Sequence, residues 1–470
     1  MAGVYEDDEK RLKVAFLHPD LGIGGAERLI VDAALALKSV DYSVTIYTSH
    51  CDSSHCFEEV KRGELKVIVY GDFLPTNILG RFKIVCAFLR QLYLTIVLIL
   101  TCKLYDYDIL ILDQLSYCIP LLNLFAWDAK ILFYCHFPDQ LLASHTSPLR
   151  SAYRFLFDKI EEVSTSYANK VVVNSNFTRS VVQKTFKLLR NSTLDVVYPC
   201  VSTDESSFLP SEVSTVQLKS ILRDSSYFLS VNRYERKKNI ELAIKSFAEY
   251  LLKTSDDHQS IVVAGGYDPL ICENVEYLKE LTSLCDKLEL SYEIIDGKSL
   301  TKYEVTEKVK KVIFLTSIST DFKNALIANC DLLMYTPTNE HFGIVPLEAM
   351  RMGKLVLADK TGGPLETIIN FFDHNETYTG FTVESDIDKW EDVLEWVKSL
   401  SEDDLTEVAE RSKKRVDELF SSLALKNKLV EVIDCMLKEK QPVMHVFITH
   451  VAVPVTSVLM FYFLSKYFFP

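Results

Sequence analysis

Two glutamates, Glu340 and Glu348, are separated by seven residues and bracket a glycine turn. The preceding run 331–336 has the continuous apolar character of a buried strand, and Pro346 suits the first position of the helix that follows. This pattern predicts Glu340 on the loop and Glu348 in the first helical turn, both at the carboxyl end of a parallel strand, where open α/β sheets bind ligands. Carboxylates beside the backbone N–H groups of 342–345 suit the hydroxyl and phosphate oxygens of a sugar nucleotide.

An acidic residue in a first helical turn, taken alone, is ordinary complementation of the helix dipole. A second strand, turn and helix start follow directly, however. The expected strand 354–359 leads into Gly362, Gly363 and Pro364, and Glu366 follows. Two adjacent units with glycine turns suited to phosphate are difficult to explain by packing alone.

These two elements resemble the donor site of the retaining GT-B glycosyltransferases of glycosyltransferase family 4. Three other segments match that family in the right order: the glycine loop 16–28, His136 within 133–138, and Arg233 and Lys238, five residues apart after a strand. Together the matches extend from about residue 12 to about residue 400, which makes the resemblance more specific than any single glycine loop.

The resemblance implies a role for each matching residue. Arg233 and Lys238 would hold the donor diphosphate, Glu340 the hydroxyls of the transferred sugar, and Glu348 the ribose or adjacent groups. His136 would line the transfer site. The remaining donor-side residues would be His341, Phe342, Gly343, Ile344, Gly265 and Gly363. A packing role for the imidazole of His341 is equally compatible with the sequence. The acceptor-side loop would be Gly22, Gly24 and Gly25.

Within family 4, the strings 340–350, 264–268, 274–277 and 232–239 resemble the endoplasmic-reticulum transferases that add the second and third mannoses to a dolichol-linked oligosaccharide. That resemblance implies GDP-mannose as donor, a dolichol-diphosphate oligosaccharide as acceptor, α1,3 and α1,6 linkages, and other dolichol-pathway transferases as partners. It also implies retention of anomeric configuration, with a leaving phosphate oxygen accepting the acceptor proton and no protein nucleophile.

Two rival interpretations stay open. The catalytic subunit that transfers N-acetylglucosamine to phosphatidylinositol is also built on a Glu-x7-Glu site, but its usual sequence lacks the run 342–347 found here. An inactive GT-B scaffold is the alternative outside enzymes. An inactive scaffold would not need all the charged residues of a donor site. The chain has four of them together, which argues against a scaffold: Arg233, Lys238, Glu340 and Glu348.

Composition agrees with a cytosol-facing enzyme. The chain of 470 residues can form two domains with separate cores, and its net charge of −14 argues against nucleic acid, which requires a basic surface. The first ten residues are acidic, and the apolar run 14–17 is too short for a signal peptide. Eleven scattered cysteines then predict reduced thiols.

No metal cofactor is expected. The segment 50–56 holds two histidines and two cysteines, but its spacing matches no standard zinc module and it follows a strand, so we interpret it as a loop. Asp106 and Asp108 resemble a metal-binding pair, yet they precede the strand 109–112 and so lie at its wrong end for a ligand. Arg233 and Lys238 would instead meet the charge of the donor diphosphate.

The alternation of strands and helices predicts an α/β protein of the GT-B class, with two Rossmann-like doubly wound domains facing a cleft plus a C-terminal transmembrane helix. The expected boundaries are 1–200, a linker 201–226, 227–402, and a helical segment 403–440 that returns to the first domain. The expected strands are 13–17, 43–47, 66–69, 109–112, 129–134 and 170–174, followed by one starting near 227 and by 260–264, 312–315, 331–335 and 354–358.

Two apolar segments point to a membrane. The stretch 442–464 has 23 residues without Lys, Arg, Asp or Glu, enough to span roughly 34 Å as a helix. We interpret it as an anchor in the endoplasmic-reticulum membrane. The stretch 84–102 is interrupted by Arg90 and Gln91, which leaves it too short to cross alone and suits either a surface helix or a buried one.

Overall fold

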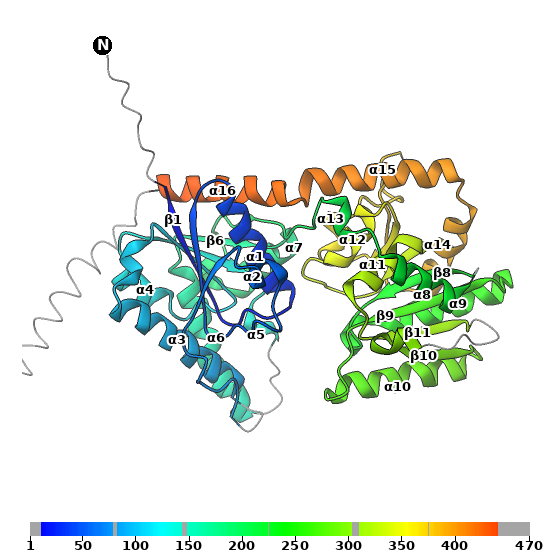
Figure 1. Cartoon of the computed structure of the whole chain (residues 1–470), viewed down its shortest axis with the longest axis horizontal. Helices are drawn as coiled ribbons and strands as arrows, with labels where there is room; N and C mark the ends of the chain where they lie inside the picture. The colour runs from blue at the N-terminus through cyan, green and yellow to red at the C-terminus, as the bar shows by residue number, and fades with distance from the viewer. Residues whose placement is uncertain are drawn as a thin grey trace, which may run out of the picture. The chain divides into compact units, whose positions relative to one another are not determined.

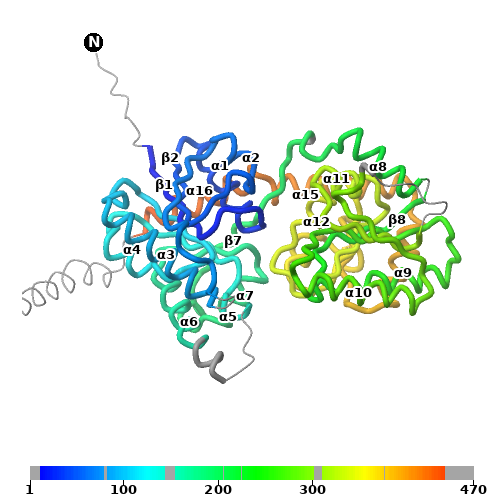
Figure 2. The backbone as a smooth tube through the Cα atoms, turned by 60° about the horizontal axis from the view of Figure 1, so that its bottom comes forward, coloured from blue at the N-terminus to red at the C-terminus, as the bar shows by residue number. Residues whose placement is uncertain are grey.

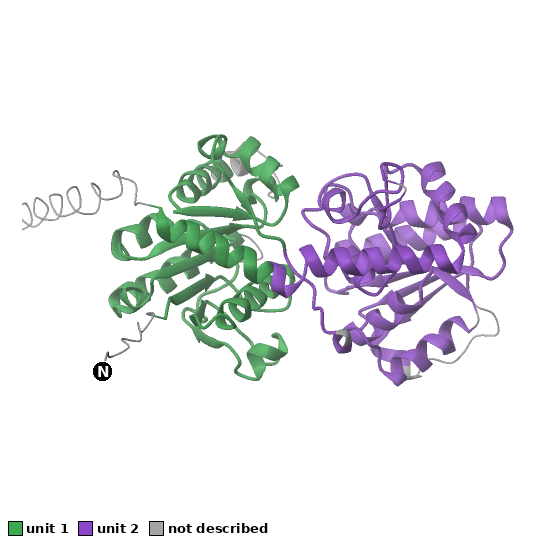
Figure 3. Ribbon diagram, turned by 90° about the horizontal axis from the view of Figure 1, so that it is seen from above, with its two compact units in different colours: residues 1–198, 425–470 green, residues 199–424 purple. Residues whose placement is uncertain are grey.

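A computed structural model describes residues 11–78, 82–142, 148–223, 225–302, 310–374 and 376–439 of the chain. The chain divides into two compact units (Figure 3). Unit 1 comprises Met1–Tyr198 and Leu425–Pro470, and unit 2 comprises Pro199–Ala424. Each unit contains one seven-stranded sheet whose pairings are all parallel, as expected for a doubly wound α/β domain.

The sheet of unit 1, of which Figure 1 labels β1 and β6, has the strand order β3-β2-β1-β4-β5-β6-β7. The order reverses between β1 and β4, the crevice where doubly wound sheets bind their ligands. The strands are β1 Lys13–His18, β2 Ser43–Thr48, β3 Lys66–Val69, β4 Ile109–Asp113, β5 Lys130–Cys135, β6 Lys170–Val173 and β7 Asp195–Val196; the helices are α1 Gly25–Lys38, α2 Glu58–Lys61, α3 Lys83–Leu100, α4 Ile119–Phe125, α5 Asp139–Leu142, α6 Pro148–Ser166, α7 Asn176–Thr185 and α16 Ser422–Lys438.

The sheet of unit 2 has the order β10-β11-β9-β8-β12-β13-β14, and its order reverses between β8 and β12. The strands are β8 Ser226–Val231, β9 Gln259–Gly265, β10 Tyr292–Asp296, β11 Val312–Thr316, β12 Leu332–Tyr335, β13 Leu355–Asp359 and β14 Phe381–Val383; the helices are α8 Glu212–Leu222, α9 Ile240–Thr254, α10 Cys272–Lys287, α11 Thr320–Asn329, α12 Ile344–Arg351, α13 Pro364–Thr367, α14 Ile387–Ser399 and α15 Glu402–Leu419.

The central strands of both sheets are buried on both faces, which is why they were recognisable as short continuous apolar runs. All eleven expected strands are present. The structure adds β7, β10 and β14, each of which lies at an edge of its sheet. β10 has one buried residue, Ile295, among half-buried and exposed ones, so it lacks the continuous apolar run of a central strand.

The structure adds two details to the expected boundaries. The segment 201–226 is not a plain linker, because it contains α8, whose Ser211 and Ser214 hydroxyls bond to Asp321 of α11. The helical segment after 402 also divides between the units: α15 belongs to unit 2, whereas most of α16 belongs to unit 1. Figure 2 shows α16, in orange, beside the blue strands of unit 1.

α3 is the helix of the described part of the chain that is long and apolar enough to cross a membrane. The two residues that interrupt its apolar sequence point into unit 1 rather than outward. Arg90 is buried and donates to the carbonyl of Ser49, and Gln91 is buried and donates to the carbonyl of Leu115. These contacts fix one face of α3 on the domain while Leu89, Ile96 and Leu100 stay exposed. The anchor expected at 442–464 lies outside the described residues.

Candidate functional site

Lys238 and Glu340 form an ion pair where the strand order of unit 2 reverses. The Lys238 Nζ lies 2.5 Å from Glu340 Oε2. Lys238 ends a short 3-10 turn after β8, and its carbonyl accepts a hydrogen bond of 2.6 Å from the hydroxyl of Thr336, directly after β12. Glu340 lies on the loop between β12 and α12. Two residues assigned to sugar-nucleotide binding, more than a hundred positions apart, are thus in direct contact.

The electrostatic surroundings keep Glu340 ionised. Burial opposes the charge, but the Lys238 ammonium and its hydrogen bond outweigh burial, and the pKa of the Glu340 carboxyl falls below its ordinary value. His341 contributes a smaller effect in the same direction. Tyr335 at the end of β12 is buried and hydrogen-bonded to Glu340, and burial followed by the glutamate charge raises the pKa of its phenol well above the ordinary value. Tyr335 therefore acts as a neutral donor.

Glu348 pairs with a lysine that sequence patterns did not single out. Both of its carboxylate oxygens accept from Lys323 of α11, at 2.6 and 2.7 Å. The predicted position of Glu348 was wrong, because α12 begins at Ile344 with Gly343 as its N-cap in the left-handed region at φ 88°. Pro346 is therefore the third helical residue, and Glu348 lies beyond the first turn.

Arg233 follows β8 and is the most accessible of the predicted donor-side cations. Its side chain is 62% exposed and pairs with Glu235 at 3.0 Å. The positive charge of Arg233 acts on the phenol of Tyr335 at the end of β12. An exposed arginine and a lysine whose side chain is 12% exposed, both on the segment after β8, can meet a diphosphate together.

Two of the donor-side glycines, Gly265 and Gly363, are required by close packing of backbone on backbone. A Cβ on Gly265 would lie 2.0 Å from the carbonyl oxygen of Asn232, and one on Gly363 would lie 2.2 Å from that of Phe342. Gly363 donates its N–H to the carbonyl of Glu340 at 2.8 Å. These glycines therefore hold the loops that carry Arg233 and Glu340, a role that differs from direct donor contact.

The acceptor-side glycines of unit 1 have no such packing requirement. A Cβ on Gly22 or Gly25 would have no described atom within 4 Å, and one on Gly24 would meet only the flexible carboxylate of Glu27. Gly22 lines a cavity of about 400 Å³ together with Asp20, Ile23, Glu27, His50, Asp52 and His55. The open space beside this loop is consistent with a ligand approaching its backbone.

The packing around Gly265 and the open space around Gly25 predict different effects of alanine substitution on stability. Gly265→Ala should destabilise unit 2 by about 3 kcal/mol, the upper end of overpacking effects, because the Asn232 backbone must move. Gly25→Ala should change the free energy of unfolding by less than about 0.5 kcal/mol, since nothing opposes the methyl group. Urea unfolding of both variants measures this. Equal destabilisation of the two proteins would contradict the packing argument.

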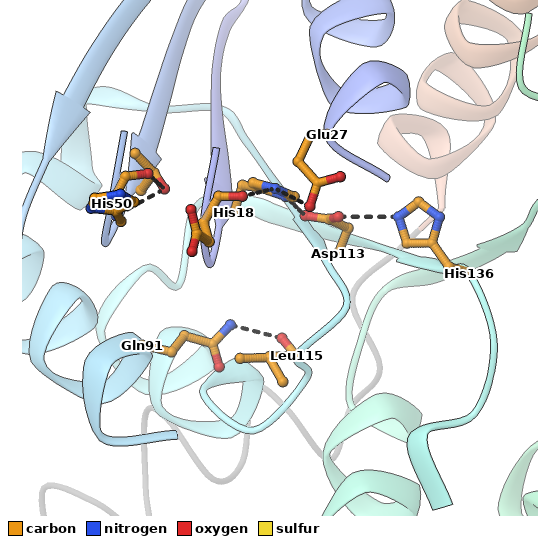
Figure 4. A network of polar contacts seen from close by, with 9 residues as sticks. His18, Glu27, His50, Gln91, Asp113, Leu115 and His136 are labelled. Carbon is orange, nitrogen blue, oxygen red and sulfur yellow. Dashed lines mark hydrogen bonds and ion pairs between the residues drawn. The ribbon is translucent and has the colours of Figure 1, made fainter. Parts of the chain in front are cut away.

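His136 lies directly after β5 in unit 1, and its Nε2 is 3.1 Å from Asp113 Oδ2 at the end of β4. The other oxygen of Asp113 lies 2.7 Å from His18 Nδ1 at the end of β1 (Figure 4). Sequence patterns identified His136 but neither Asp113 nor His18. The available signal was that each is a polar residue ending a buried apolar strand.

The two segments considered for metal binding have structural contacts. Asp108 accepts a hydrogen bond of 2.9 Å from the backbone N–H of Lys13, which ties the starts of β4 and β1 together. The segment 50–56 is a loop, as predicted, and His50 pairs with Asp72 at 2.6 Å. Among the described residues, no group of three or more His, Cys, Asp or Glu side chains is arranged to hold a metal ion.

Fold and site together define a glycosyltransferase of the GT-B class. The model of Glycosyltransferase Family 4 matches residues 23–205, and that of Glycosyl transferases group 1 matches residues 217–418. Among solved structures, sucrose-phosphate synthase from Thermosynechococcus elongatus has a TM-score of 0.65 at 17% identity, covering 91% of this chain and 99% of its own. The catalytic domain of starch synthase IV from Arabidopsis thaliana, bound to ADP and acarbose, has a TM-score of 0.64 at 14% identity, covering 91% and 100%.

Curated relatives are much more similar. The alpha-1,3/1,6-mannosyltransferase ALG2 of Candida glabrata is 48% identical over 94% of this chain and 97% of its own length. The ALG2 protein of Saccharomyces cerevisiae is 47% identical over 92% of this chain and 87% of its own. The chain belongs to the ALG2 family of alpha-1,3/1,6-mannosyltransferases.

Proposed function

We propose that this protein transfers mannose from GDP-mannose to a dolichol-diphosphate oligosaccharide that already carries one mannose. An α1,3 and an α1,6 linkage are added in turn, and the product carries three mannoses. The family of alpha-1,3/1,6-mannosyltransferases supports the sugar and the two linkages. The resemblance in 232–239, 264–268 and 340–350 supports the donor and acceptor.

The observation that carries this proposal is the Lys238–Glu340 pair at the reversal point of the unit 2 sheet. Lys238 and Glu340 together offer a positive and a negative group to the two parts of a sugar nucleotide. The ammonium suits a phosphate oxygen, and the carboxylate suits the hydroxyls of the sugar bonded to that phosphate. Bound donor would take Lys238 away from Glu340 and leave the carboxylate free to accept from the mannose.

The chemical step places negative charge on the leaving GDP and positive charge on the sugar ring. Lys238 and Arg233 stabilise the leaving phosphate, and fixed charges near a leaving group are among the largest contributions to catalysis. Retention follows when a phosphate oxygen accepts the proton of the attacking hydroxyl on the same face of the sugar. In that route Glu340 binds hydroxyls and forms no covalent bond.

Purified protein should convert a lipid-linked trisaccharide with one mannose into products heavier by one and then two hexoses when supplied with GDP-mannose. Mass spectrometry of the released oligosaccharides measures this. UDP-N-acetylglucosamine with phosphatidylinositol is the matched comparison. If the protein transferred N-acetylglucosamine to phosphatidylinositol and did not transfer mannose, it would be the N-acetylglucosaminyltransferase and this proposal would be wrong.

Transfer should need no divalent metal, because Lys238 and Arg233 supply the charges that a metal would otherwise bring to the diphosphate. Activity in excess EDTA should remain within about twofold of the untreated rate. The control is a metal-dependent glycosyltransferase in the same buffer. Complete loss restored only by magnesium or manganese would assign a ligand role to Asp106 and Asp108 or to the segment 50–56.

We also propose that the protein is bound to the endoplasmic-reticulum membrane through 442–464, with both units in the cytosol. All donor-side and acceptor-side residues expected from the sequence lie between Gly22 and Gly363. Deleting 441–470 should therefore release part of the protein from membranes while preserving transfer in detergent to a short-chain lipid acceptor. A folded deletion protein without any transfer would show that the tail takes part in acceptor binding.

A further inference from the structure

Three polar side chains form a continuous line at the reversal point of the unit 1 sheet. His18, Asp113 and His136 come from the carboxyl ends of the neighbouring strands β1, β4 and β5. Asp113 lies between the two histidines, 2.7 Å from His18 Nδ1 and 3.1 Å from His136 Nε2 (Figure 4). No role assigned so far uses His18 or Asp113.

Geometry determines the protonation of His18. Its Nε2 lies 2.9 Å from the carbonyl oxygen of Asp20, which can only accept, so Nε2 carries a proton. Its Nδ1 faces the Asp113 carboxylate and must also carry one. His18 is therefore an imidazolium, although its side chain is fully buried.

The charges around His18 agree with this assignment. Burial opposes the cation, but the charge and hydrogen bond of Asp113, assisted by Glu27 of α1 at 4.0 Å, raise the pKa of His18 above its ordinary value. Burial also opposes ionisation of Asp113, and the two histidines outweigh it, so the pKa of Asp113 is lowered. His18 and Asp113 therefore form a buried pair with no net charge.

The second oxygen of Asp113 then determines the state of His136. It accepts from Nε2, which must therefore carry a proton, so Nδ1 is the nitrogen of this ring that can offer a lone pair. The His136 side chain is 20% exposed, whereas those of His18 and Asp113 are 0% and 1% exposed. His136 is thus the member of the line that a substrate can reach.

We propose that Asp113 and His18 are positioning residues that fix His136 with its proton on Nε2 and present Nδ1 as a hydrogen-bond acceptor for a sugar hydroxyl of the bound substrate. This proposal rests on the mannosyl transfer proposed above. Asp113 orients the ring. His18 balances the aspartate charge, because an unbalanced carboxylate would favour the protonated ring of His136, which has no lone pair to accept with.

Asp113→Asn tests the positioning role, because an amide preserves shape but can no longer accept from both histidines. The turnover number should fall about 10²-fold with little change in KM for GDP-mannose, since the donor groups lie in unit 2. The matched control is Asp108→Asn at the opposite end of β4, whose carboxylate contacts the Lys13 backbone. Its turnover should stay within about twofold of wild type.

His18→Gln provides a second readout that a merely structural role would not move. The variant removes the balancing cation, so the acid limb of the turnover against pH profile should shift to higher pH. The charged groups that the described structure places against His18 are Asp113 and Glu27, and both favour this direction. Binding of GDP and the unfolding temperature show whether each variant is folded.

An unchanged pH profile in His18→Gln, or normal turnover in folded Asp113→Asn, would overturn the proposal while wild-type transfer still supports the function. Failure of the wild type to use GDP-mannose would instead refute the function itself. If Asp113→Asn does not fold, the pH profile of His18→Gln decides alone.

Discussion

Replacing Lys238 by alanine should lower the turnover number about 10²–10³-fold at saturating GDP-mannose, the loss typical of removing one group that stabilises charge in the transition state. The ammonium lies 2.5 Å from Glu340 and can exchange this partner for an oxygen of the leaving phosphate. Steady-state kinetics with the lipid-linked acceptor measure the effect.

Lys237→Ala is the matched control for this variant. Lys237 is the preceding residue in the same turn, but its side chain is 66% exposed and pairs with Glu235 instead of Glu340. Its removal should change turnover by less than about threefold, since an exposed ion pair contributes little. If Lys238→Ala kept near-normal turnover, or if both variants lost activity equally, the assignment of Lys238 to the leaving group would be wrong.

Glu340→Gln should lower turnover by about 10²-fold and also weaken unit 2. The glutamine can still hydrogen-bond, but it cannot balance the charge of Lys238, and the ammonium stays partly buried without its counter-ion. Because the two residues act as one unit, the double variant Lys238→Ala with Glu340→Gln should be about as slow as Lys238→Ala alone. Multiplicative losses would show that the residues act independently.

The loss of stability in Glu340→Gln should depend on pH. The pKa of Glu340 is lowered in the folded protein, so its ionisation stabilises unit 2 above the pKa of the unfolded chain, and this contribution is lost as pH falls through the folded value. The deficit of Glu340→Gln in urea unfolding should therefore be largest near neutral pH and shrink on acidification. Glu276→Gln on α10, where the carboxylate is exposed, is the control. A deficit independent of pH would contradict the argument.

Sequence patterns identified the central strands of both sheets because parallel strands buried on both faces are continuous apolar runs. They missed the edge strands β7, β10 and β14, which are short or exposed on one side. The start of α12 was misplaced for a different reason. Proline is compatible with any position of the first turn, since the N–H it lacks has no partner there.

The sequence predicted those parts of the candidate site in which one short segment contains both the functional residues and the glycine turn between them. Glu340 and Glu348 were found in this way, whereas Lys323, the partner of Glu348, was not, because it lies on a separate helix that looks like an ordinary packing element. His18 and Asp113 were missed because the contact between them joins positions 95 residues apart. The order of the strands in the sheet determines which of these residues come into contact, and a local sequence motif does not contain that order.

The position of α16 has a consequence for synthesis of the chain. Leu425, Leu429, Val432, Ile433 and Met436 of this helix are buried, and Lys130 of β5 donates to the carbonyl of Glu439. Unit 1 therefore cannot be completed until residues near 439 have left the ribosome, by which time all of unit 2 has emerged. Unit 1 is therefore the last to close, and until then the apolar residues of α16 and the surface that they cover are open to chaperones and to aggregation.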